Sequence, residues 1–178
     1  MTQAGWQGAG WSWPDDRGRM TGIAFSMQDD IDRIMAIMEA AFDPAYGEAW
    51  NRRQVEDSLV FGNCHYLLVG VDGTPPSPGA PAAGFALSRT GFGEEELMLF
   101  AVDPAFRRRG IGRQLLQLFA DSARSRGVET LFLEMRKGNP AEYLYRSFGF
   151  EPIGERPNYY RVPGGGRIDA VTFSCKNK

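Results

Sequence analysis

One stretch of this chain, residues 97–116, limits the folds open to it more than any other part of the sequence. The apolar run Leu97 to Val102 predicts a β-strand, and Pro104 ends it. A helix is predicted to follow, with these apolar residues on one face: Ile111, Leu115, Leu118 and Phe119. Between strand and helix lies a basic turn with two glycines, Arg107-Arg108-Arg109-Gly110-Ile111-Gly112. The sequence therefore predicts a strand, turn and helix unit with the basic turn at the N-terminus of the helix.

The turn in this unit is suited to bind an anion. The first N–H groups of a helix have no partners within the helix and carry the positive end of its dipole. Gly110 and Gly112 have no side chains that would block these groups. A phosphate can therefore approach the backbone itself, and the turn predicts a pyrophosphate site.

Two other phosphate motifs fit the turn poorly. A dinucleotide site needs Gly-x-Gly-x-x-Gly with an acidic ribose ligand further on, and a P-loop needs a Lys-Ser or Lys-Thr pair. The chain has Arg-x-x-Gly-x-Gly, from Arg107 to Gly112, with neither addition. A helix cap surrounded by solvated arginines is the plainer alternative, and the turn by itself leaves it open.

The composition limits the class of protein. At 178 residues the chain suits one domain with a substantial core. Its net charge of −2 argues against wholesale nucleic-acid binding and makes the basic turn a local feature. Cys64 and Cys175 are too few for a disulfide scaffold and form no Cys-x-x-Cys zinc motif. With no membrane-spanning stretch and no signal-peptide pattern, we expect a cytoplasmic protein without a metal.

We divide the chain into a flexible N-terminal tail, residues 1–20, and a single domain, residues 21–178. The tail is rich in glycine and polar residues, and its tryptophans show no helical or strand periodicity. The domain is expected to open with a short strand, residues 22–25, after which Ser26 caps a helix. One face of that helix is apolar and predicted to be core: Ile31, Ile34, Met35, Met38 and Phe42.

Strands and helices alternate through the rest of the domain. Strands are predicted over residues 66–71, 83–88, 130–135, 150–154 and 170–174, and helices over residues 113–126 and in a short segment ending at Phe148. The proline-rich residues 72–81 predict a surface loop. His65 is interpreted as structural, because it abuts Tyr66 at the start of a strand and no pattern of a catalytic triad or metal site surrounds it. With antiparallel pairs at both ends, this order predicts a mixed central sheet flanked by helices.

The turn and several later segments together resemble the GNAT superfamily of N-acetyltransferases. The run Arg107 to Gly112 after Val102-Asp103-Pro104 is similar to the acetyl-coenzyme A (acetyl-CoA) signature of that family. Further on, Leu133-Glu134-Met135-Arg136 resembles the next strand of that family, and Asn139 resembles its asparagine. The end of its following helix is resembled by the run Leu144-Tyr145-Arg146-Ser147-Phe148-Gly149-Phe150. Two later runs, Arg156-Pro157-Asn158-Tyr159-Tyr160 and Ile168-Asp169-Ala170, resemble the RimI branch of the family, which acetylates the N-terminal alanine of a ribosomal protein. The likeness covers residues 22–173 in outline and is sharp over residues 96–170.

This resemblance implies a fold and a co-substrate. The implied fold is an α/β fold of the mixed α+β type: a central, mostly antiparallel sheet with a splayed parallel pair and flanking helices. The implied co-substrate is acetyl-CoA, with no metal. Backbone N–H groups of Ala101 and Val102 would hold the pantetheine arm and polarise the thioester carbonyl. The pyrophosphate would be bound by the N–H groups of Arg109, Gly110, Gly112 and Arg113 and by the guanidinium of Arg107 or Arg108.

Tyr145 and Glu134 are the catalytic residues that the resemblance implies. A phenol stays protonated at neutral pH, so Tyr145 can protonate the departing thiolate, although packing under the turn at Gly149-Phe150 is the alternative. Glu134 would take the proton of the amine through a water molecule. A salt bridge with Arg136 or another cation is the other interpretation of Glu134, and Glu96 is its rival as base.

Asn139 departs from the family pattern in its spacing. It lies six positions before Tyr145, whereas the family usually has seven. The corresponding asparagine would reach the pantetheine amide, but capping of the following helix also explains this residue. The short spacing puts the family role of Asn139 in doubt rather than that of Tyr145, because Tyr145 keeps its usual spacing in the sequence to Gly149-Phe150.

The acceptor side is expected to hold an amine between aromatic rings. Trp50, within the segment 43–59, and the pair Tyr159 and Tyr160 are the predicted acceptor-binding residues, and Asp169 either binds a cation or braces their loop. The resemblance implies transfer to a protein N-terminal α-amine. A small-molecule amine, a polyamine or a lysine is the alternative acceptor, and a non-catalytic acyl-CoA-binding module is the alternative function. We expect no nucleic-acid or membrane partner and either a monomer or a homodimer.

Overall fold

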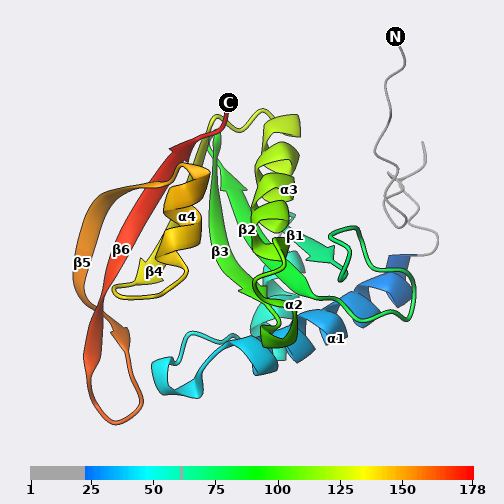
Figure 1. Cartoon of the computed structure of the whole chain (residues 1–178), viewed down its shortest axis with the longest axis horizontal. Coiled ribbons are helices and arrows are strands. Elements are labelled where there is room, and N and C mark those ends of the chain that lie inside the picture. The colour runs from blue at the N-terminus through cyan, green and yellow to red at the C-terminus, as the bar shows by residue number, and fades with distance from the viewer. Residues whose placement is uncertain (1–22, 61) are drawn as a thin grey trace.

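The computed structural model describes residues 23–60 and 62–178 (Figure 1). The predicted tail, residues 1–20, lies outside the described residues, so the division into tail and domain stays a prediction. The helices are α1 (Ile23–Ala41), α2 (Arg52–Val60), α3 (Ile111–Ser125) and α4 (Glu142–Phe148), with 3₁₀ turns η1 (Pro44–Tyr46) and η2 (Pro104–Phe106). The strands are β1 (Cys64–Val69), β2 (Gly84–Gly91), β3 (Glu94–Val102), β4 (Thr130–Arg136), β5 (Glu151–Arg161) and β6 (Arg167–Lys176). None of the described helices is long and apolar enough to cross a membrane.

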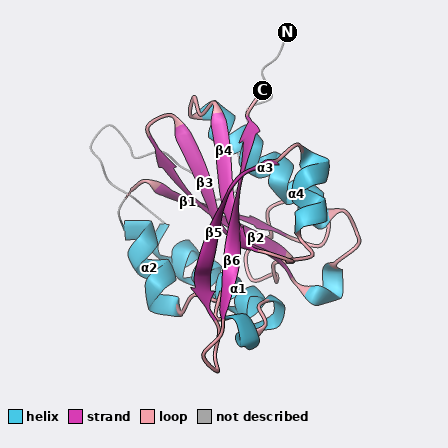
Figure 2. Ribbon diagram, turned by 90° about the vertical axis from the view of Figure 1, so that its left-hand side faces the viewer, coloured by secondary structure: helices cyan, strands magenta, loops and turns pink. Residues whose placement is uncertain are grey.

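The strands form one six-stranded sheet in the order β1-β2-β3-β4-β6-β5. Every neighbouring pair is antiparallel except β3 and β4, which are parallel. Helices α3 and α4 lie on one side of this sheet, and helices α1 and α2 lie on the other side (Figure 2). The predicted fold class, a mixed sheet with one parallel pair and flanking helices, is confirmed.

Each side of the sheet has its own core. The amphipathic face of α3 packs on the sheet through these buried residues: Ile111, Leu115, Leu116, Phe119, Ala120 and Ala123. On the other side, Ile34, Ile37 and Met38 of α1 pack against Phe85 and Leu99. The face predicted for α1 is confirmed, because Ile31, Ile34 and Met38 are buried and Met35 and Phe42 are half-buried.

A β-bulge in β3 separates its two halves. Leu97 pairs with Ser88 and Leu99 with Leu87, so Met98 is the inserted residue. Such a bulge bends its strand and exchanges the faces of the residues beyond it. Leu97 accordingly belongs to the core under α3, whereas Leu99 belongs to the core under α1.

Pairing between β3 and β4 stops at this bulge. The parallel pairs run only from Glu94 with Thr130 to Leu97 with Leu133, although β3 continues to Val102 and β4 to Arg136. The predicted splay of the parallel pair is therefore confirmed. The strands are joined at one end, called the closed end below, and leave a gap at the other, called the open end.

Two local predictions differ from the structure. The expected strand over residues 22–25 is wrong, because α1 begins at Ile23, and Ser26 lies inside this helix rather than capping it. Periodicity cannot separate helix from strand in an apolar segment this short, and here the helical pattern that follows extends back through it. The strand predicted over residues 150–154 continues to Arg161, so β5 and β6 form a long ribbon that curves away from the helices (Figure 1).

Candidate active site

The turn between β3 and α3 presents open backbone N–H groups. Gly110 precedes the helix with φ of 83° and without a side-chain cap, and Arg108 also has a positive φ, 63°. The first backbone bond of the helix is the one that Gln114 donates to Gly110. The N–H groups of residues 111–113 are thus left for a ligand or solvent, as at any helix start. The turn therefore has the open N–H groups that the sequence predicted, and anion binding there stays a prediction.

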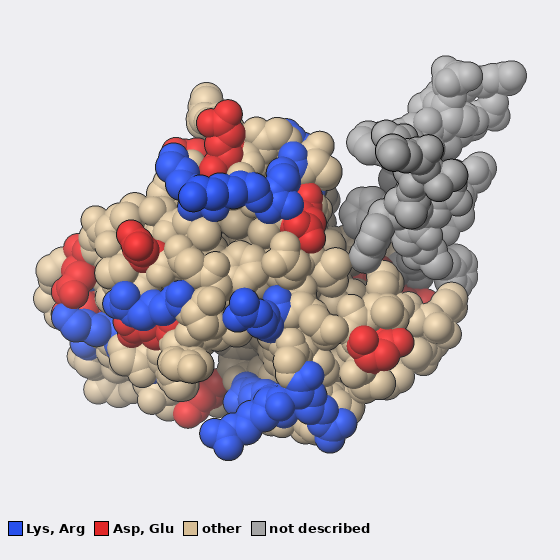
Figure 3. Space-filling view, turned by 45° about the horizontal axis from the view of Figure 1, so that its top comes forward, with Lys and Arg blue, Asp and Glu red and all other residues tan. Residues whose placement is uncertain are grey.

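The four arginines of the turn differ in their partners. Arg107 donates through Nε to the carbonyl of Val102 at 3.1 Å and through a terminal nitrogen to Ala41 at 3.3 Å. Arg109 lies 5.5 Å from the ring centre of Phe106. Among the described residues, the exposed side chains of Arg108 and Arg113 have neither an ion pair nor a hydrogen bond. Arg108 and Arg113 are therefore the side chains free to meet an anion, and Figure 3 shows basic side chains gathered beside a hollow at the lower end of the face drawn.

The open end of β3 directs backbone N–H groups into the gap. Asp103 donates its N–H to Ala83, before β2, at 2.9 Å. Because backbone groups alternate sides along a strand, the N–H of Ala101 points toward β2 as well. The N–H groups of Phe100 and Val102 then face the gap left by β4. Of the two residues expected to hold the pantetheine arm, the structure places the N–H of Val102 in the gap and that of Ala101 on the β2 side.

Gly112 lets the start of α3 approach α4 closely. A Cβ at this position would lie 3.1 Å from Cδ2 of Leu144 and 3.7 Å from Cγ2 of Val102. Cβ atoms rarely come as close to a neighbour as 3.1 Å, so a larger residue at position 112 would require the end of the Leu144 side chain to shift. The glycine therefore serves packing in addition to keeping the turn open to an anion.

Tyr145 of α4 reaches this gap from the α3 side of the sheet. Its side chain is 7% exposed and its ring packs edge-on against Phe100 and Phe150, with ring centres 5.9 Å and 6.0 Å away. Burial raises the pKa of its phenol, with a smaller contribution from the negative charge of Glu48. The hydroxyl has no hydrogen-bond partner among the described residues. Tyr145 is thus a packed ring with a free, protonated hydroxyl.

Asn139 stabilises the turn that precedes α4, whose N-cap residue is Ala141. Its Oδ1 accepts a hydrogen bond from the N–H of Ala141 at 3.0 Å, and its carbonyl accepts one from Glu142 at 3.1 Å. These contacts fix the turn that leads into α4, although Asn139 is not the cap residue of the helix itself. A contact with the pantetheine amide stays a prediction.

The carboxylates expected as bases are both engaged. Glu134 of β4 accepts from the hydroxyl of Thr172 at 3.1 Å and pairs with Arg156 of β5 at 3.2 Å. Its cationic partner is therefore Arg156 and not Arg136. Glu96 forms an exposed ion pair with Arg89 at 2.7 Å.

The predicted aromatic pair lies on β5 beside Glu134. The rings of Tyr159 and Tyr160 meet edge-to-face with centres 5.1 Å apart. The charge of Glu134 and a hydrogen bond to it raise the pKa of the Tyr159 phenol. Burial, followed by the charges of Glu134 and Glu48, raises that of Tyr160. Asp169 accepts a hydrogen bond from the N–H of Asn158 at 2.8 Å, so it braces this bulged segment.

The structure does not bring Trp50 into contact with these tyrosines. Trp50 is half-buried and packs at the edge of the core under α1. It also lines a shallow hollow with Asn63, Arg89 and Met98. Among the described residues, no ring contact joins it to Tyr159 or Tyr160. Its role in acceptor binding stays a prediction.

Sequence reasoning missed one carboxylate, Glu48, in the loop between η1 and α2. Its Oε2 accepts a hydrogen bond from Nε of Arg136 at 3.2 Å, and that guanidinium lies 3.6 Å from the ring centre of Tyr46. Burial raises the pKa of Glu48, partly offset by Arg136. The only available signal was its position in segment 43–59, since the two partners are 88 residues apart. Within the part of the chain that the structure describes, no three His, Cys, Asp or Glu side chains are grouped as a metal site requires.

Comparison with known proteins gives the family. Residues 31–150 match the acetyltransferase (GNAT) family. The chain is 46% identical to N-alpha-acetyltransferase RimI of Mycobacterium tuberculosis over 136 residues, which cover 74% of this chain and 75% of that protein. The chain belongs to the acetyltransferase (GNAT) family, as the sequence motifs predicted.

Further relatives agree with this assignment. The ribosomal protein bS18-alanine N-acetyltransferase of Haemophilus influenzae is 39% identical over 92 residues, which cover 52% of this chain and 63% of that protein. The chain thus spans less than two thirds of the length of that relative. The crystal structure of the ribosomal-protein-S18-alanine N-acetyltransferase from Escherichia coli superposes with a TM-score of 0.70 at 30% identity, covering 84% of this chain and 89% of that chain.

Proposed function

We propose that this chain transfers the acetyl group of acetyl-CoA to the α-amine of a protein N-terminus. One observation carries the proposal: the free hydroxyl of Tyr145 belongs to a ring packed on Phe100, whose N–H faces the gap beside the anion-binding turn. A proton donor, N–H donors and an anion site therefore converge at one place. The names of the relatives, RimI and S18-alanine acetyltransferases, support the acceptor class.

The residues of the gap and the turn fit acetyl-CoA, which supplies a thioester for the amine to attack. The open N–H groups at residues 111–113 suit its pyrophosphate, and the unpaired Arg108 and Arg113 add charge-assisted contacts. The N–H groups of Val102 and Phe100 suit the pantetheine arm and the thioester carbonyl. Donors fixed in this way stabilise the negative charge that develops on the carbonyl oxygen during attack.

Proton transfers complete the reaction. A carboxylate on the acceptor side takes one proton from the acceptor ammonium, and the neutral amine attacks the carbonyl carbon. As the carbon–sulfur bond breaks, Tyr145 gives its proton to the sulfur and regains one from the new amide nitrogen through solvent. Glu134 is the base proposed from the sequence. Glu96 is less suited, because its partner Arg89 holds it in an exposed ion pair.

The free energy of deprotonation favours an α-amine over a lysine. An α-amine with a pKa near 8 costs about 1.4 kcal/mol to deprotonate at pH 7, whereas a lysine near 10.4 costs about 4.6 kcal/mol. A carboxylate is a weak base, so the α-amine is the easier acceptor. The edge-to-face rings of Tyr159 and Tyr160 can hold the first residues of such a peptide.

A competition assay tests the acceptor class. One peptide carries a free N-terminal alanine, a second is blocked there and carries an internal lysine, and free polyamines form a third arm. The N-terminal sequence of ribosomal protein bS18, named in the relatives, is the first to use. We expect the free-alanine peptide to have the highest kcat/KM. A higher kcat/KM for the lysine peptide or a polyamine would replace the proposed acceptor, and no release of free coenzyme A thiol with any amine would favour a non-catalytic binding module.

A further inference from the structure

The loop between η1 and α2 carries a carboxylate into the acceptor side of the site. Glu48 and Arg136 are joined by the single 3.2 Å hydrogen bond to Oε2, and their side chains are 18% and 14% exposed. The ring of Tyr46 lies under the guanidinium and restricts its movement. The η1–α2 loop is thereby fixed against the open end of β4.

Glu48 is linked to three elements of the site. It accepts a hydrogen bond from Arg136 of β4, and its charge acts on Tyr145 of α4 and Tyr160 of β5. Tyr46, at the end of η1, packs on Arg136. The negative charge of Glu48 raises the pKa of the phenols of both Tyr145 and Tyr160. The charge of Glu48 therefore acts on both the proposed proton donor and one of the rings expected to hold the acceptor.

The two acceptor-side carboxylates differ in how many of their lone pairs are in use. Glu134 accepts a hydrogen bond from Thr172 and pairs with Arg156, and its charge raises the pKa of the neighbouring Tyr159 phenol. Glu48 has Arg136 as its one hydrogen-bond partner, and its Oε1 has no hydrogen bond to any described residue. An ionised carboxylate has about four acceptor sites, so Glu48 retains the capacity to bind an ammonium group.

We propose that Glu48, oriented by Arg136 and Tyr46, binds the acceptor ammonium and accepts its proton, an assignment that rests on the function proposed above. Glu134 then has a positioning role, since its ion pair with Arg156 links β4 to the part of β5 that carries Tyr159 and Tyr160, across the intervening strand β6. The bonds to Thr172 and Arg156 that use the carboxylate oxygens of Glu134 are the same bonds that position these strands.

The proton transfer assigned to Glu48 is balanced. An N–H of the ammonium donates to Oε1, the N–H bond breaks, and the proton remains on Oε1. The nitrogen lone pair is then free to attack the carbonyl carbon held in the gap. After release of the acetylated product, the carboxyl of Glu48 gives its proton to solvent, and Arg136 stabilises the returning negative charge.

This assignment predicts a particular pH dependence. In the parent, Glu48 must be ionised and the amine protonated when they meet. The value of kcat/KM therefore rises as the pH passes upward through the raised pKa of Glu48 and levels off before the amine pKa of about 8. Without Glu48, turnover depends on amine that is already neutral, a fraction that grows about tenfold per pH unit below pH 8.

The test is the pH profile of kcat/KM for Glu48→Gln with an alanine-terminated peptide. We expect a loss of about 100-fold at pH 6.5 that shrinks to less than about tenfold at pH 9, with an unchanged Kd for acetyl-CoA and an unchanged unfolding midpoint. Glu155→Gln is the matched control, because Glu155 pairs with Lys137 at 2.9 Å on the exposed surface. It should keep the parent profile.

Two further variants separate Glu48 from Glu134. Arg136→Met should move the acidic limb of the parent profile to higher pH, because Arg136 lowers the pKa of Glu48. Glu134→Gln should lower kcat/KM by a similar factor at every pH. A parent-like profile in Glu48→Gln, or loss of the acidic limb in Glu134→Gln, would overturn the assignment of Glu48 while leaving N-terminal acetylation intact. If the parent acetylates no peptide α-amine, the proposed function fails and the assignment fails with it.

Discussion

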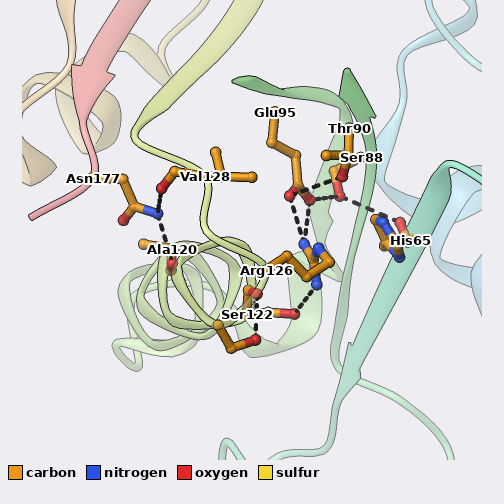
Figure 4. Close-up of polar contacts among 10 residues, drawn as sticks. His65, Ser88, Thr90, Glu95, Ala120, Ser122, Arg126, Val128 and Asn177 are labelled. Atoms are coloured by element: carbon orange, nitrogen blue, oxygen red, sulfur yellow. Dashed lines mark hydrogen bonds and ion pairs between the residues drawn. The ribbon is translucent and has the colours of Figure 1, made fainter. Parts of the chain in front are cut away.

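Two carboxylate–guanidinium pairs lie at opposite ends of the splayed strands, and their carboxylates differ in burial and in the number of hydrogen bonds that they accept. At the closed end, Glu95 is 0% exposed and accepts from Ser88 at 2.5 Å, from Thr90 at 3.1 Å and from Arg126 at 2.5 Å and 2.7 Å (Figure 4). Arg126 donates in addition to Ser122. At the open end, Glu48 accepts a single hydrogen bond from the described part of the chain, and Arg136 donates it.

The difference indicates what each pair does. Glu95 pairs with Leu131 in the parallel register, and Arg126 follows α3 directly, so the closed-end pair ties β3 to the C-terminus of α3. All of its hydrogen-bonding capacity is used by the protein, as a buried charge requires. The open-end pair retains capacity, because a binding site must leave some polar atoms free for its ligand. An ion pair whose carboxylate accepts its full number of hydrogen bonds from the protein stabilises the fold. An ion pair whose carboxylate keeps a free acceptor oxygen is available for ligand binding and catalysis.

The largest effect is expected at the closed end. Arg126→Met would leave the buried carboxylate of Glu95 without its cation, which we expect to lower the free energy of unfolding by about 3 kcal/mol. Urea unfolding measures this. Arg124→Met is the control, since Arg124 pairs with Asp121 on the exposed surface and should cost less than about 1 kcal/mol. Equal losses of unfolding free energy in the two variants would contradict the distinction between the buried, fully hydrogen-bonded pair and the exposed pair.

The next effect concerns the proton donor at the open end. Tyr145→Phe keeps the ring packed against Phe100 and Phe150 and removes only the hydroxyl. We expect kcat to fall about 100-fold, or about 2.7 kcal/mol, with little change in the unfolding midpoint or in the affinity for acetyl-CoA. Tyr143→Phe, on the exposed side of the same helix, should leave kcat unchanged. Unchanged turnover in Tyr145→Phe, with chemistry rate-limiting, would assign this tyrosine to packing alone.

The smallest effect is expected in the basic turn, where an arginine without protein partners should bind ligand and an arginine with partners should stabilise the fold. Arg108 has no partner among the described residues, whereas Arg107 donates to the carbonyls of Val102 and Ala41. Arg108→Ala should weaken acetyl-CoA binding about fivefold, less so at high salt, and leave stability unchanged. Arg107→Ala should instead lower the free energy of unfolding by about 1 kcal/mol. Calorimetric titration and urea unfolding of both variants measure the two effects, and the reverse pattern would contradict the rule.

The parts of the fold that were predicted from the sequence depend on local patterns. The strand before Pro104, the turn at Gly110 and the apolar face of α3 lie within about twenty residues, so their periodicity and turn residues are sufficient. The splay of β3 and β4 was expected only from the family resemblance. Its physical origin, the bulge at Met98, depends on the register with β2 and has no signal in the sequence of β3.

The site was predicted where a motif carried it and missed where the contact was long-range. The exposed turn and the packing of Tyr145 below Phe150 follow from adjacent residues. The partner of Glu134 was left open between Arg136 and another cation, and it is Arg156 of the neighbouring ribbon. Glu48 was not identified, because only the folded chain brings the η1–α2 loop to the end of β4.

The most direct test of this account is the position of the acetyl group on a peptide that offers both kinds of amine. The peptide has a free N-terminal alanine and an internal lysine, and fragment masses after partial turnover with acetyl-CoA locate the modification. The account predicts acetylation of the α-amine, with the lysine unmodified until the α-amine is consumed. Acetylation of the lysine first, or of both amines at similar rates, would contradict it.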